Sequence, residues 1–181
     1  STRYVFGQSV ALYDNLLAVG APHDGSCATG TLSGANSLLP LYSAAATGCE
    51  RTGAIYLFRY AEAAWSADAY FKAYNPVQKS SSQYGGSYST VVGFGYAVAI
   101  YEDTLVAGLS DERACAIGPT GVSTIPATDD RCQITGAAYV YTRSGSTWSF
   151  DAYLKAPNAE AGDRFGYAVA IYEDTIVVGA H

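Results

Sequence analysis

The chain has 181 residues, of which 49% are hydrophobic and 14% are charged, and its formal net charge is −6. This acidic balance, with an isoelectric point near 4.7, disfavours binding to nucleic acid or to anionic membrane surfaces, because both carry dense negative charge. The sequence holds no apolar run of about 18 residues or more, so it predicts a globular segment without a membrane-spanning helix.

One phrase occurs three times and divides the chain into repeats. It starts at Phe6, Phe94 and Phe165 as FGQSVALYDNLLAVG, FGYAVAIYEDTLVAG and FGYAVAIYEDTIVVG. The distance from the opening Phe to the closing Gly is the same in all three copies. Self-similarity at such a period predicts stacked supersecondary units rather than one enzyme core.

Each copy of the phrase predicts two strands, A and B, because apolar and polar side chains alternate on either side of a tight acidic turn. An aromatic and β-branched run after it predicts strand C, and a further run after a turn predicts strand D. The predicted strands are 8–13, 16–20, 54–60 and 69–73 in the first unit, and 96–101, 104–108, 137–142 and 150–156 in the second. Only strands A and B follow Phe165, and no segment shows a sustained helical period.

These strands predict an all-β fold of four-stranded antiparallel units. The first unit spans residues 1–75, a Gly/Ser/Tyr-rich connection spans 76–93, the second unit spans 94–164, and the first half of a third spans 165–181. Four antiparallel strands that recur about every 70 to 90 residues are typical of a β-propeller or of a linear β-array.

The four cysteines occupy equivalent positions in the two units. Cys27 and Cys115 each follow the end of a strand B, and Cys49 and Cys132 each precede a strand C. We therefore predict the disulfides Cys27–Cys49 and Cys115–Cys132, each closing one B-to-C connection, which places the chain in an oxidising compartment outside the cell or at its surface. A shared zinc site is the alternative, but no Cys-x-x-Cys spacing occurs and the sequence has only two histidines.

All length differences between the repeats fall in the B-to-C and D-to-A connections, which strand parity places on one face of the units. Loops on a rigid scaffold are where binding usually occurs, so this face is the predicted contact surface for a protein or glycan ligand. Drift in surface loops is the alternative. The candidate partner-binding residues are Tyr84, Tyr88, Asp129, Asp130 and Arg131.

Several repeated residues predict structural roles. Each phrase opens with an aromatic core residue followed by a glycine that allows close backbone approach. Trp65 and Trp148 share one repeat position and are interpreted as packing anchors rather than sugar-stacking platforms. Lys72 and Lys155 also share one position, and we expect both to be solvated strand ends. The Phe-Gly pairs are Phe6-Gly7, Phe94-Gly95 and Phe165-Gly166.

No arrangement of residues predicts catalysis. A Ser-His-Asp site would have to use His23 or His181, and the glycine-rich segment 84–88 lacks the strand-loop-helix context of a phosphate cradle. We therefore expect no enzyme activity and no catalytic residues.

The phrases FGYAVAIYEDTIVVGA, GAPHD, GAAYVYTRSGSTW and LKAPNAEAGDRFG resemble the FG-GAP repeats of integrin α-subunit propellers and of many bacterial and eukaryotic surface proteins. The resemblance covers nearly the entire chain, and it implies a seven-bladed β-propeller that acts in extracellular adhesion or ligand binding. Many FG-GAP repeats bind calcium between strands A and B. Here those turns are only Asp14-Asn15, Glu102-Asp103 and Glu173-Asp174, too short to supply the six to eight oxygens that calcium requires. No cofactor or metal is expected, although calcium could bind elsewhere in a longer parent chain.

Seven blades would need on the order of 500 residues, whereas this sequence holds about two and a half. We expect either that the remaining blades belong to a longer parent protein, or that neighbouring copies complete the half blade and build a surface filament or appendage.

Overall fold

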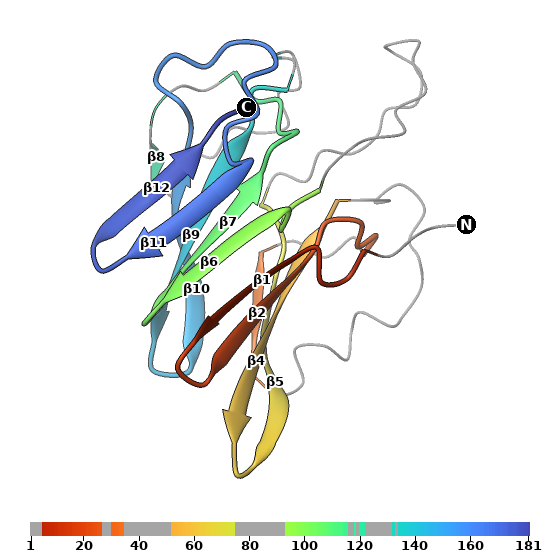
Figure 1. The fold of residues 1–181 in the computed structure, drawn as a ribbon, viewed down its shortest axis with the longest axis vertical. Coiled ribbons are helices and arrows are strands. Elements are labelled where there is room, and N and C mark those ends of the chain that lie inside the picture. Colours follow the sequence, from red (N-terminus) through yellow and green to blue (C-terminus); the bar gives the residue numbers. More distant parts are fainter. Residues whose placement is uncertain are drawn as a thin grey trace.

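The computed structural model describes residues 5–26, 30–34, 52–74, 93–115, 118, 120–121, 132 and 134–181, and its regular elements are all β-strands (Figure 1). The predicted all-β class is confirmed. In this part of the chain no helix is long and apolar enough to cross a membrane.

The strands form two five-stranded antiparallel sheets and one hairpin (Figure 1). The first sheet has the order β1-β2-β4-β5-β3, and the second repeats it as β6-β7-β9-β10-β8. The first contains β1 (Ser9–Tyr13), β2 (Leu16–Ala21), β3 (Thr31–Ser33), β4 (Ala54–Ala61) and β5 (Ala64–Phe71). The second contains β6 (Ala97–Tyr101), β7 (Thr104–Leu109), β8 (Thr120–Gly121), β9 (Ala137–Ser144) and β10 (Thr147–Leu154). The terminal hairpin pairs β11 (Ala168–Tyr172) with β12 (Thr175–Gly179).

The fifth strand of each sheet was not predicted. Strands β3 and β8 come from the B-to-C connection and pair with the outer edge of β5 and β10. They satisfy backbone groups that an open edge would expose, but they are too short to show an alternating pattern in the sequence. Strand D also begins earlier than predicted, because a two-residue turn at Glu62 and Ala63, both with positive φ, joins it directly to β4.

The acidic A-to-B turns take the backbone conformation expected of them. Asp14, Glu102 and Glu173 each have a φ of 49°. This left-handed conformation is what a tight hairpin turn requires. The turn prediction from the sequence is therefore confirmed in all three repeats.

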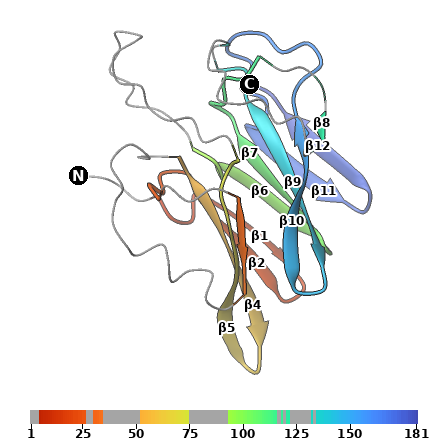
Figure 2. The ribbon, with the colours of Figure 1, turned by 180° about the vertical axis from the view of Figure 1, so that it is seen from behind.

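The sheets stack face to face and bury one continuous core. Strand β1 contacts β6, and β6 contacts β11, so the three units lie side by side (Figures 1 and 2). The first sheet contributes Phe71, whose ring centroid lies 4.9 Å from that of Tyr141 and 5.6 Å from that of Trp148 in the second sheet. Such repeated, stacked sheets are consistent with blades of a β-propeller.

Adjacent units also touch through their backbones at glycines. Phe94 N donates to Thr52 O at 3.1 Å, and Gly53 and Phe94 form a parallel bridge. Gly136 and Phe165 form the same bridge one unit later. A Cβ placed on Gly53 would lie only 2.2 Å from Phe94 O, so a larger residue cannot fit without moving one of the units. We call these contacts the glycine stitch.

The closing glycine of the repeated phrase is part of this stitch, which the sequence did not indicate. A Cβ on Gly20 would lie 2.0 Å from Gly95 O, and a Cβ on Gly108 would lie 2.0 Å from Gly166 O. At the same position in the terminal hairpin, a Cβ on Gly179 would meet nothing closer than Ala168 Cβ at 3.5 Å. The glycine is therefore required only where another unit follows within the structure.

This difference predicts opposite effects for one substitution at two equivalent positions. Gly108→Ala should lower the free energy of unfolding by roughly 1 to 3 kcal/mol, because the added methyl forces the second sheet away from the terminal hairpin. Gly179→Ala should be neutral or stabilising by up to about 1 kcal/mol, because alanine restricts the unfolded chain. Urea unfolding of both variants measures the difference, and equal losses would show that the stitch does not set the spacing of the units.

Candidate functional site

The base of each B-to-C connection is a closed backbone junction. In the first sheet Asp24 N donates to Ala21 O at 2.9 Å, and Gly53 N donates back to Asp24 O at 2.9 Å. In the second sheet Glu112 N donates to Leu109 O at 3.2 Å, and Gly136 N donates to Glu112 O at 2.9 Å. The two ends of the connection are thus held together where it leaves and rejoins the sheet.

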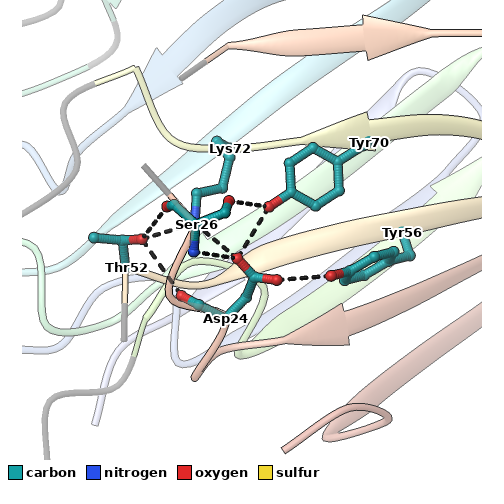
Figure 3. Close-up of polar contacts among 6 residues, drawn as sticks. All are labelled: Asp24, Ser26, Thr52, Tyr56, Tyr70 and Lys72. Carbon is teal, nitrogen blue, oxygen red and sulfur yellow. Dashed lines mark hydrogen bonds and ion pairs between the residues drawn. The ribbon is translucent and has the colours of Figure 1, made fainter. Parts of the chain in front are cut away.

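A buried ion pair reinforces this junction in the first sheet (Figure 3). Lys72 Nζ, just beyond β5, donates to Asp24 Oδ1 at 3.1 Å and to Thr52 Oγ1 at 2.7 Å. The Asp24 carboxylate also accepts from the hydroxyls of Tyr56 at 2.6 Å and Tyr70 at 3.0 Å. The cluster therefore joins the start of the connection, its end and the end of strand D.

The second sheet repeats the arrangement with a longer acid. Lys155 Nζ lies 2.7 Å from Glu112 Oε2 and 2.5 Å from Thr135 Oγ1. Ala114 N donates to Glu112 Oε1 at 2.8 Å. The Lys155 and Glu112 side chains are 0% and 2% exposed. We call the groups Asp24-Thr52-Lys72 and Glu112-Thr135-Lys155 the lysine clamps.

The expectation that Lys72 and Lys155 are solvated is wrong. Both strands end just before the lysine, and each buried ammonium binds residues at the two ends of the B-to-C connection. A buried ammonium is tolerated because each has a carboxylate and a hydroxyl partner. The repeats carry a signal that could have revealed this. In both units an acid lies four residues after the closing glycine of the repeated phrase, and a threonine lies directly before the glycine that precedes strand C.

The electrostatics of the first clamp follow from burial and pairing. Burial lowers the pKa of Lys72, and the neighbouring Asp24 carboxylate opposes that shift. Burial acts to raise the pKa of Asp24, but Lys72 and the hydrogen bonds from Tyr56 and Ser26 outweigh it, so the pKa is lowered. Burial and the nearby Asp24 charge raise the pKa of both Tyr56 and Tyr70. At neutral pH Asp24 is therefore an acceptor and both tyrosines are donors.

This chemistry suits anchoring rather than reaction. In each clamp the ammonium and the carboxylate bind one another and neighbouring hydroxyl or backbone groups. Such a satisfied buried network fixes geometry, and breaking it is costly. The clamps hold the base of the connection in one position relative to the sheet.

A disulfide ties the second connection covalently. Cys115 and Cys132 form the predicted bond, with their Cα atoms 5.1 Å apart and a sequence separation of 17. Cys132 N also donates to Arg113 O at 3.1 Å. Closing a loop of this length contributes roughly 3 kcal/mol in the chain-entropy picture. The predicted Cys27–Cys49 pair and the candidate contact residues Tyr84, Tyr88, Asp129, Asp130 and Arg131 lie outside the described residues.

The two tryptophans occupy different environments despite their shared repeat position. Trp148 is 2% exposed, and its Nε1 donates to Asp68 Oδ2 of the first sheet at 3.3 Å. Trp65 is 48% exposed and contacts the ring of Tyr60. The opening aromatic residues also differ, since Phe94 is buried, Phe165 is half-buried and Phe6 is exposed. Packing therefore depends on whether the preceding unit covers the sheet.

The family model described as FG-GAP repeat matches residues 148–181. This part of the chain is therefore similar to an FG-GAP repeat. The matched segment runs from β10 through β12 and so includes the Gly136 partner Phe165 and the whole terminal hairpin. No match was found among curated proteins.

Removing only one partner of the second lysine clamp should lower the stability of the fold strongly. Lys155→Met should lower the free energy of unfolding by about 3 to 5 kcal/mol, because it leaves the buried Glu112 charge without its ammonium. Combining it with Glu112→Gln should cost much less than the sum of the two single changes, since the residues are directly coupled. Chemical unfolding of the oxidised chain gives these values.

The exposed pair Arg143–Asp103 provides the control. Arg143 Nε donates to Asp103 Oδ1 at 2.7 Å, but Asp103 is largely in solvent. Asp103→Asn should therefore cost less than about 1 kcal/mol. A Lys155→Met penalty no larger than this would contradict the anchoring role of the clamp.

Proposed function

We propose that the chain is a non-catalytic binding or adhesion module that acts outside the cell or at its surface. Two observations support this. FG-GAP repeats are common in adhesion proteins, and the Cys115–Cys132 disulfide suits an oxidising compartment. The partner would be a protein or a glycan.

The observation that carries the proposal is the double anchoring of the second B-to-C connection. The Cys115–Cys132 bond and the Glu112-Thr135-Lys155 clamp hold both of its ends to a rigid sheet. A loop fixed at its base loses less conformational freedom when a ligand binds, which favours affinity. Asp129, Asp130 and Arg131 lie between the anchored ends in the sequence and supply both signs of charge for a polar partner.

Binding by this loop predicts a face-specific effect of substitution. The purified chain is tested on a glycan array and on immobilised collagen, fibronectin and laminin. Asp129→Asn, Asp130→Asn and Arg131→Gln together should weaken any binding found by about tenfold or more, the equivalent of roughly 1.4 kcal/mol. The same substitutions should leave the unfolding midpoint unchanged, because they lie beyond the anchored base.

The control is a charge change on the opposite face. Asp14→Asn with Glu102→Gln removes two exposed acids at the A-to-B turns and should leave binding intact. No binding to any of these probes, or an equal loss in both variants, would contradict the proposed contact face.

A second candidate function is a structural subunit whose units pair between chains. It is favoured by the uncovered apolar face of the first sheet that carries Val10, a residue that is 64% exposed. Its repeat equivalent Val98 is 8% exposed because the first sheet covers it. Leu12 and Ile100 differ in the same way. An apolar face of this kind favours an interaction with the covering face of another unit.

Assembly between copies predicts concentration-dependent sedimentation of the chain. Leu12→Lys should abolish it by placing a charge in the apolar face, whereas Glu160→Gln alters the net charge equally at an exposed site outside that face and should not. The emission of Trp65 should also shift to the blue on assembly, while buried Trp148 should report no change. A monomer at every concentration would exclude this second candidate without affecting the first.

A further inference from the structure

Tyrosines at one repeat position form a row of touching rings across all three units. Tyr13, Tyr101 and Tyr172 end strands β1, β6 and β11, directly before the A-to-B turns. The ring centroids of Tyr13 and Tyr101 are 4.8 Å apart, and those of Tyr101 and Tyr172 are 5.5 Å apart. The three hairpins lie side by side with their turns at the same end (Figure 1). We call these residues the tyrosine row.

The row is both accessible and rigid. Tyr172 is exposed, and Tyr13 and Tyr101 are partly exposed, so a small reagent can reach all three. Each tyrosine is also held in the register of its hairpin, where it pairs with Leu16, Thr104 or Thr175. The rings therefore stay in contact while they remain open to solvent.

We propose that the tyrosine row is a site of oxidative cross-linking, in which a peroxide activated by a haem peroxidase couples neighbouring rings. Each of two phenols gives up one electron and one proton. The two phenoxyl radicals then form a carbon–carbon bond between ring positions next to the oxygens. The hydrogen on each of these carbons moves to its oxygen and restores the phenol, and the peroxide is reduced to two waters.

Proximity favours coupling within the row over coupling between chains. Two radicals on adjacent strands are held together before the bond forms, so coupling is effectively intramolecular and competes well with collisions between chains. Tyr101 lies in the middle and can couple to either neighbour. The product would tie the first strands of adjacent units (β1, β6 and β11) covalently, in addition to the glycine stitch. This inference does not rest on the proposed binding function.

The experiment oxidises the dilute, purified chain with hydrogen peroxide and a haem peroxidase, then reduces its disulfides and digests it with trypsin. We expect each cross-link to remove two hydrogen atoms from the intact mass without forming a dimer. Tyr13, Tyr101 and Tyr172 fall in the separate tryptic peptides 4–51, 80–113 and 165–181. The expected products join the first of these to the second, and the second to the third.

Conservative variants assign the links. Tyr101→Phe keeps the ring packing and should abolish both products, whereas Tyr13→Phe should remove only the first. Tyr172→Phe should remove only the second, and this separates it from the Tyr96–Tyr167 contact, whose centroids are 5.2 Å apart in the same two peptides. Tyr60→Phe, at an exposed tyrosine beside Trp65, is the control and should change nothing.

Three results would overturn the proposal. The native chain could yield no linked peptides, the link between peptides 4–51 and 80–113 could persist in Tyr101→Phe, or the links could form only between chains in proportion to concentration. Each of these outcomes is read from the same peptide map and intact mass.

Discussion

The close approach of backbones at the glycine stitch sets the geometry on which the other contacts depend. Gly20 and Gly108 leave no room for a Cβ against the carbonyl of the next unit, and Gly53 and Gly136 face the backbone of the next opening phenylalanine in the same way. Because these contacts involve the main chain, side-chain repacking cannot relieve a larger residue there. The fixed separation then lets the apolar faces of the sheets meet at normal packing distance, as Phe71 and Trp148 do.

A second kind of constraint acts at the same end of the strands, where Gly53 N donates to Asp24 O and Gly136 N donates to Glu112 O. The lysine clamps hold charged groups in the interior, which is favourable only because each charge has its partner in place. Their position at the base of the B-to-C connections means that the connection can vary in length while its ends stay fixed. This separation of a constant frame from a variable loop supports the proposed binding role.

The sequence predicted the hairpins and their turns well because alternation and turn chemistry are local properties. It missed β3 and β8, because two or three residues carry no period and their pairing depends on an edge that only the folded sheet creates. It misplaced Lys72 and Lys155, since lysine is rarely buried and only the distant acids Asp24 and Glu112 make burial possible. It could not distinguish Trp65 from Trp148, because their difference lies in what covers each sheet.

The match to the FG-GAP repeat is out of phase with the sheets. It starts at Trp148 in the last long strand of one sheet and ends after the first hairpin of the next unit. The matched segment therefore contains the junction between the second sheet and the terminal hairpin. Cutting the chain between β10 and β11 would leave the Gly136–Phe165 bridge to hold two separate fragments together, so a boundary drawn at the end of the second sheet would divide one packed interface.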